Sequence, residues 1–174
     1  RTIVLSAIRK GQSDIYVYDV GSNSYEQITK DHYDDLYPRF INNSKEIVFS
    51  SNRINDTIRF ENKFKTGEVQ ERYDLFLYDY QKKSNLLRWV TKTPLSNEIK
   101  AMEYENKYIS FLSDKNGIYN RYIGQFDSAI SYIDTTTHYR YYTRSFPVTD
   151  YSRNIIEHDI VPEIDKLAQV IYKD

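Results

Sequence analysis

The sequence predicts an all-β chain that forms part of a β-propeller, with four-stranded antiparallel blades of about 44 residues. The first observation is a repeated segment: Ser-Asp-Ile-Tyr-Val-Tyr-Asp at 13–19 returns as Tyr-Asp-Leu-Phe-Leu-Tyr-Asp at 73–79. Each copy follows an apolar run that ends in small residues, at 3–7 and at 47–51. The second observation is the regular spacing of turn residues, and the third is that helical periodicity is nearly missing.

The apolar runs set the length of the repeat. The runs that begin at Ile3 and Ile47 are 44 residues apart, and a weaker copy begins at Ile109, 62 residues further on. A polar, charged stretch at 54–71 contains the 18 extra residues and is interpreted as an insertion. The next interval is also long, which places a second insertion near 125–137. A period of about 40–45 residues made of short strands is typical of a propeller blade.

The first interval shows how one blade is expected to form. Runs rich in Ile, Val and Tyr alternate with turns rich in Gly, Asn, Asp and Ser. Because neighbouring blades cover a blade on both sides, its strands should be apolar or aromatic on both faces, as the run at 15–18 is. The expected strands are 3–8, 14–19, 25–29 and 37–41, and the expected turns are 10–13, 21–23, 31–35 and 42–44.

The whole chain is interpreted as one fragment of a longer propeller, in units 1–41, 42–103, 104–153 and the start of a fourth at 154–174. The best helical candidate, 162–167, is too short for an isolated helix, so we expect a hairpin turn there. That turn would join strands at 154–160 and 167–172. The end strands 1–8 and 167–172 lack their neighbours, and we expect them to pair with each other in a mixed blade or with a second chain.

Composition excludes several classes of function. The 24 basic and 25 acidic residues are dispersed, which argues against a general nucleic-acid binder. The absence of cysteine excludes disulfides and thiolate metal sites, and no apolar run is long enough to span a membrane. The 18 tyrosines are explained by strand propensity and cross-strand pairing, with a sugar- or peptide-binding aromatic platform as the alternative.

Motifs for catalysis and cofactors are missing from the sequence, so we expect neither an enzyme nor a cofactor. Gly-Gln-Ser-Asp-Ile at 11–15 lacks the last glycine of a nucleophile elbow and precedes a strand. The three histidines, His32, His138 and His158, lie in different units without short ligand spacing, so we expect no shared metal. The segment 114–117 resembles the opening of a calcium loop but is better explained as an Asn-Gly turn.

Two motifs resemble the repeat of the TolB-type β-propeller family. Asp-Leu-Tyr-Pro-Arg-Phe at 35–40 followed by Ile-Val-Phe-Ser-Ser-Asn-Arg at 47–53 is similar to that repeat, as is the segment 9–19. The family's closing Leu-Thr pair is matched by Ile28-Thr29 and Val90-Thr91. The chain departs from the pattern at 54–71 and at 128–143, where no closing pair is found.

This resemblance implies a scaffold used mostly for binding, in the periplasm or cell envelope of a bacterium. We therefore expect a non-enzymatic protein-interaction module with a protein or peptide partner in the envelope. The alternative is the substrate-gating propeller of a serine peptidase whose catalytic domain lies outside this chain. A weaker alternative is a glycan-binding propeller that uses surface tyrosines such as Tyr33 and Tyr151.

The candidate binding face is formed by loops that emerge on the same side of a propeller. Its aromatic side chains and its charges of both signs suit a protein or peptide better than nucleic acid, although the apolar ones also suit local packing of the long loop. The connector at 30–36 contributes His32, Tyr33, Asp34 and Asp35, and the insertion contributes Arg59, Phe60, Lys63, Phe64 and Lys65.

Overall fold

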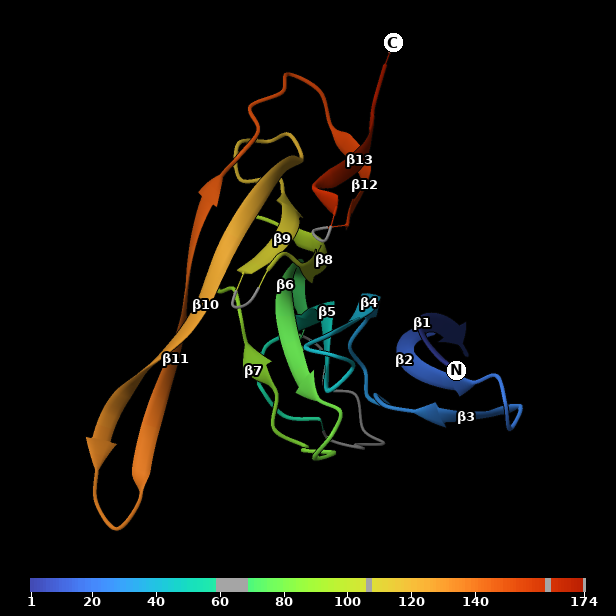
Figure 1. Ribbon diagram of the computed structural model, residues 1–174, viewed down its shortest axis with the longest axis vertical. Helices are drawn as coiled ribbons and strands as arrows, with labels where there is room; N and C mark the ends of the chain where they lie inside the picture. Colours follow the sequence, from blue (N-terminus) through green and yellow to red (C-terminus); the bar gives the residue numbers. More distant parts are fainter. Residues whose placement is uncertain (59–68, 106–107, 162–163, 174) are drawn as a thin grey trace.

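The computed structural model of the chain describes residues 1–58, 69–105, 108–161 and 164–173. The strands of this part form four separate sheets, and it contains no α-helix (Figure 1). None of its elements is a helix that could cross a membrane. The expectation of an all-β fold with four-stranded antiparallel sheets is confirmed.

The sheets follow one another in chain order, and consecutive strands pair antiparallel within each of them. The first sheet contains β1 (Thr2–Arg9), β2 (Gln12–Asp19) and β3 (Ser24–Gln27). The second contains β4 (Asp35–Ile41), β5 (Glu46–Arg53), β6 (Val69–Asp79) and β7 (Arg88–Trp89). The third contains β8 (Glu98–Glu103), β9 (Tyr108–Ser113), β10 (Asn120–Ile133) and β11 (Thr137–Pro147), and the last contains β12 (Ile155–Val161) and β13 (Lys166–Ile171).

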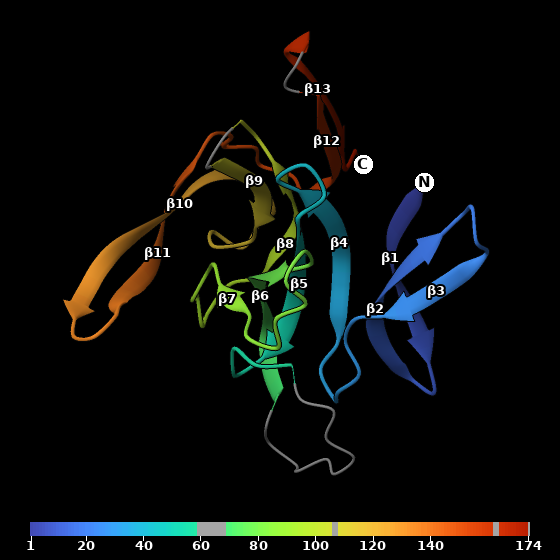
Figure 2. The same ribbon diagram turned by 60° about the horizontal axis from the view of Figure 1, so that its bottom comes forward.

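The first strands of successive sheets lie side by side, so the sheets are arranged like neighbouring blades. β4 contacts β1 and β2 on one side and β8 on the other, and β8 contacts β12 (Figure 2). The first sheet begins with the apolar run itself, in β1, whereas each later sheet begins one strand before its apolar run. The last strands of the intervals 1–41 and 42–103 therefore belong to the following sheets. We call the contacts between successive sheets the first, second and third junctions.

The two ends of the chain do not pair with each other. Among the described strands, β1 pairs only with β2 and β13 only with β12. The expectation of a mixed blade formed by both ends is therefore wrong for the single chain. The reason is geometric, because the first and last sheets lie apart and each contacts a central sheet instead: β1 contacts β4, and β12 contacts β8 (Figure 1).

The central sheet is covered on both faces, as the apolar run at 75–78 predicts. Phe76 and Tyr78 of β6 pack in the cluster of the first junction, with Ile15 of β2. Leu75 and Leu77 point the other way, into the cluster of the second junction. Alternation along a strand thus buries both sets of side chains, and this sheet forms the rigid centre of the molecule.

The expected turns form where glycine and asparagine allow them. Lys10 and Gly11 join β1 to β2 with positive φ values of 55° and 82°, as a two-residue hairpin with glycine requires. The hairpin expected around 162–167 is also confirmed, since β12 and β13 pair antiparallel.

A long hairpin contains the second insertion, which the sequence predicts near 125–137. β10 and β11 pair in register from Tyr122 and Pro147 to Ile133 and Thr137, with one irregularity. The pairing of β10 with β9 ends at Gln125, so the outer part of the hairpin projects beyond the sheet (orange in Figure 1). The departure from the repeat pattern at 128–143 thus corresponds to this hairpin. Cross-strand pairing of its many tyrosine, threonine and isoleucine residues explains the extension.

Candidate functional site

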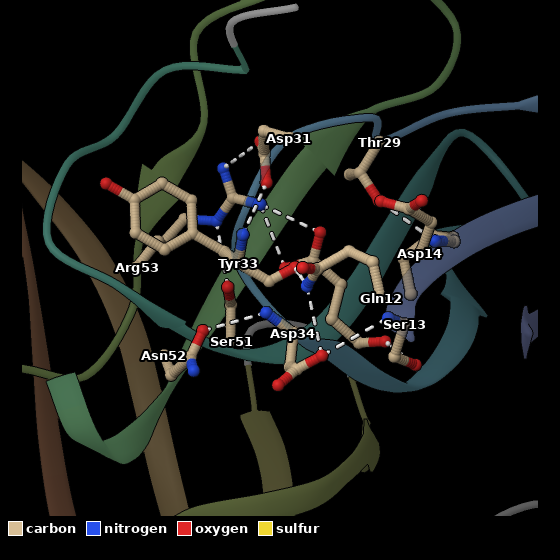
Figure 3. A network of polar contacts seen from close by, with 12 residues as sticks. Gln12, Ser13, Asp14, Thr29, Asp31, Tyr33, Asp34, Ser51, Asn52 and Arg53 are labelled. Atoms are coloured by element: carbon tan, nitrogen blue, oxygen red, sulfur yellow. Dashed lines mark hydrogen bonds and ion pairs between the residues drawn. The ribbon is translucent and has the colours of Figure 1, made fainter. Parts of the chain in front are cut away.

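The first junction contains a fully buried arginine that binds two carboxylates. Arg53 lies at the end of β5, and its Nη2 donates to both carboxylate oxygens of Asp35, each at 2.8 Å. Its Nη1 donates to Oδ2 of Asp31 at 3.3 Å (Figure 3). Because both bonds of Nη2 are charge-assisted and join the two strand ends, the pair fixes the start of β4 against the end of β5.

The charges of this group stabilise one another. Burial lowers the pKa of Arg53, but the carboxylates of Asp35 and Asp31 raise it above its ordinary value. Burial raises the pKa of Asp31, against the opposing effect of Arg53, and Asp35 raises it further. The two carboxylates thus share one cation.

The connector residues predicted for a binding face mostly point into this junction. Asp35 is fully buried on Arg53, and Tyr33, 3 % exposed, places its ring 5.1 Å from the guanidinium. Oδ1 of Asp34 accepts a bond from Gln12 at 3.0 Å, and the ring of His32 lies 4.0 Å from that of Tyr33. Tyr33 and Asp35 are thus interior side chains, and Tyr33 is not exposed to a glycan.

The other predicted residues of the binding face, Arg59, Phe60, Lys63, Phe64 and Lys65, lie outside the described residues. Tyr151, the second tyrosine named for the glycan hypothesis, is 39 % exposed. Of the sequence-predicted face, the structure thus places only the connector part, which lies at the first junction.

A backbone bond from one sheet to the next recurs at all three junctions. An N–H group in or just before an inner strand donates to the side chain of the residue that precedes the next sheet. The pairs are Ser13 with Asp34 at 3.2 Å, Tyr73 with Asn97 at 3.2 Å, and Tyr119 with Asn154 at 2.7 Å. These bonds hold successive sheets at the same relative position.

A threonine closes each of the first three sheets in the same way. Its hydroxyl accepts a backbone N–H: Thr29 from Ile15 at 2.9 Å, Thr91 from Leu75 at 2.8 Å, and Thr149 from Arg121 at 2.8 Å. The third closing pair, which the sequence did not reveal, is thus Val148-Thr149. The elongated hairpin displaces it beyond the segment in which the repeat places it.

Glu98 takes the place of Asp35 at the second junction. It is 1 % exposed, and its carboxylate accepts hydroxyl bonds from Ser96 at 2.9 Å and Ser113 at 3.0 Å, and also from Thr93. Burial raises its pKa to about 7, although these hydrogen bonds oppose the shift. The carboxylate of Asp114, the calcium-loop candidate, is also hydrogen-bonded within the chain. It accepts bonds from the backbone N–H and the side-chain amide of Asn97, at 2.6 and 2.7 Å.

The third junction contains a second buried arginine. Arg121 of β10 is 5 % exposed, and its Nε donates to Nδ1 of His158 at 3.4 Å. Its Nη2 donates to Oε1 of Gln169. His158 is 1 % exposed, and its Nε2 lies 2.8 Å from the carbonyl oxygen of Lys100. Burial lowers the pKa of both Arg121 and His158.

The histidines do not meet. His32 lies at the first junction and His158 at the third, and His138 lies on β11 with its side chain outside the described part. Within the part of the chain that the structure describes, no three His, Asp or Glu side chains form a group that could hold a metal ion.

No protein-family model matches the chain, and no curated protein matches it.

Proposed function

We propose that the chain is a non-enzymatic protein-interaction scaffold of the TolB-like propeller type, which binds a protein or peptide partner in a bacterial cell envelope. The resemblance of the repeat motifs supports the family and the compartment. The projecting β10–β11 hairpin is the observation that carries the binding role (Figure 1).

The polar side chains of the first junction are hydrogen-bonded to one another, and this supports a scaffold rather than an enzyme. Asp35 and Asp31 are bound by Arg53, and the hydroxyl of Ser13 donates to the carbonyl oxygen of Asp35 at 3.2 Å. These groups are buried between sheets, where they stabilise the junction. A nucleophile or a general base needs access to a substrate, and these side chains have none.

The outer part of the hairpin offers two free strand edges. Beyond Gln125, β10 pairs only with β11 among the described strands, and β11 has no second neighbour there. Unpaired N–H and C=O groups of such an edge bind an extended peptide by adding a strand. The proposed partner therefore presents an extended segment, which would explain recognition without a deep pocket.

Two variants test the proposal. In the first, Asn-Gly replaces residues 128–141, so that a two-residue turn joins the paired residues Asp127 and Tyr142. In the second, a Gly-Ser linker of equal length replaces residues 59–68, which leaves the buried Ile58 in place. Each variant is first compared with the wild type by its denaturant midpoint.

Cross-linking to bacterial envelope extracts, followed by mass spectrometry, provides the measurement. We expect the wild type to capture one partner that the hairpin variant loses, because the free edges are removed. The linker variant shows whether the predicted insertion contributes as well. If both folded variants capture the same proteins as the wild type, the proposal is wrong.

A further inference from the structure

The position of Arg121 is unusual for the repeat to which it belongs. The same position is Ile15 in the first sheet and Leu75 in the second, identified by identical bonds to the closing threonines. Both of these side chains are fully buried in the apolar clusters. An arginine therefore occupies a site that the architecture fills with an aliphatic residue.

The guanidinium of Arg121 is buried without an anion. Its hydrogen-bond acceptors are a histidine ring and an amide oxygen, and no salt bridge joins it to an acidic side chain within residues 1–58, 69–105, 108–161 and 164–173. Its Nη1 group has no hydrogen-bond partner in the same ranges. Buried charges of this kind are normally paired, because desolvation of a lone charge is costly.

A cavity of about 610 Å³ lies against Arg121, between the third sheet and the β12–β13 hairpin. This volume is in the range of sites for small molecules. The lining also contains two carboxylates and one ammonium group, those of Glu105, Asp165 and Lys166, and all three residues are exposed, so that water screens their charges. Its walls are largely apolar and include Ile123, Phe146, Val148, Ile160 and Leu167.

We propose that this cavity binds a carboxylate with an apolar body, with its carboxylate on Nη1 of Arg121. A carboxylate supplies the missing negative charge and accepts charge-assisted hydrogen bonds from the guanidinium. The apolar walls cover the rest of the ligand, since the hydrophobic effect favours its transfer from water. The same chemistry occurs in a free monocarboxylic acid and at a peptide C-terminus that ends in an apolar residue.

The first arm of the test uses 3-phenylpropionate and its neutral amide, titrated into the full chain by calorimetry. We expect saturable binding of the acid and at least about tenfold weaker binding of the amide, because the amide lacks the charge. Equal binding of the two compounds, or no saturable binding of the acid, would overturn the proposal.

The second arm uses two variants. Arg121→Leu restores the residue type of Leu75 and should remain folded while it loses binding of the acid. Arg72→Leu, which removes an exposed arginine at the start of another inner strand, should bind like the wild type. Unchanged binding by Arg121→Leu, or equal loss in Arg72→Leu, contradicts the assigned site.

The third arm identifies the source of the carboxylate. A tripeptide ending in phenylalanine is titrated with a free and with an amidated C-terminus. Tighter binding of the free-ended peptide than of phenylpropionate assigns the site to a peptide C-terminus, and the reverse order assigns it to a small acid. In both cases binding must depend on Arg121.

Discussion

The first and third junctions each bury one arginine, and their surroundings differ in one respect. Arg53 binds the carboxylates of Asp35 and Asp31, whereas Arg121 binds a neutral histidine and an amide. The pKa of Arg53 is raised by its anionic partners, and that of Arg121 is lowered by burial. Arg53 is thus paired with anions of its own chain, whereas Arg121 is the cation that we assign to a ligand.

The largest expected effect on stability comes from removing Arg53, the arginine that is paired with carboxylates. Arg53→Leu leaves Asp35 and Asp31 buried without a cation, so we expect the free energy of unfolding to fall by about 3–5 kcal/mol. Urea unfolding followed by circular dichroism measures the change. The matched control is Arg39→Leu, which removes an exposed salt bridge to Asp159 and should cost at most about 1 kcal/mol. Similar losses in both variants would refute the structural role of Arg53.

The second junction has a buried carboxylate without a cation, and its stability should depend on pH. The pKa of Glu98 in the folded chain is about 7, above its unfolded value, so the folded state binds more protons between the two values. Stability is therefore highest below the unfolded pKa and falls as pH rises toward 7. Relative to Glu98→Gln, we expect the wild type to lose about 2 kcal/mol between about pH 5 and pH 8.

Denaturant midpoints of both proteins across this range provide the measurement. A parallel pH dependence of wild type and Glu98→Gln would show that this carboxylate is already ionised in the folded chain.

The third junction should respond to the loss of its arginine in the opposite sense from the first. Arg121→Leu removes a desolvated charge and restores an aliphatic residue, so we expect stability to stay unchanged or to rise by up to about 2 kcal/mol. Urea unfolding of Arg121→Leu and Arg53→Leu in the same buffer gives the comparison directly. A loss in Arg121→Leu as large as that in Arg53→Leu would mean that both arginines are structural.

The smallest expected effect concerns His158 beside Arg121. Burial, and to a lesser extent Arg121, lowers the pKa of His158 in the folded chain, so the unfolded chain binds more protons below about pH 6.5. The contribution of the neutral imidazole is complete above that pH and is lost as pH falls. We expect the wild type to lose stability relative to His158→Asn between about pH 7.5 and pH 5. A constant difference between the two proteins would contradict this sign.

The sequence was sufficient for the strands of the first interval, because each apolar run there is bounded by its own turn residues. The turn at Lys10 and Gly11 forms where glycine permits a positive φ. The sequence was also sufficient to predict that both faces of the central sheet are covered. All four residues of the run at 75–78 are apolar or aromatic, so both faces of this strand carry side chains suited to burial. Local pattern and tertiary environment agree in these segments.

The candidate site was less accessible to sequence reasoning. Asp35 and Tyr33 were assigned to an exposed loop for their polarity, but Arg53 from another strand satisfies them inside. Such a pairing depends on which strand ends meet in space. Arg121 was missed because its repeat copy is weak, and the signal in the sequence is an arginine at a position occupied by Ile15 and Leu75.

The recurring bonds between sheets also bear on how the chain folds as it is synthesised. The separation between donor and acceptor is 21 residues for Ser13 and Asp34, 24 for Tyr73 and Asn97, and 35 for Tyr119 and Asn154. Each sheet is thus secured by a side chain that appears soon after its own last strand. Contacts of short sequence separation close with little loss of loop entropy. The chain is therefore suited to acquire its structure one sheet at a time, from the N-terminus onward.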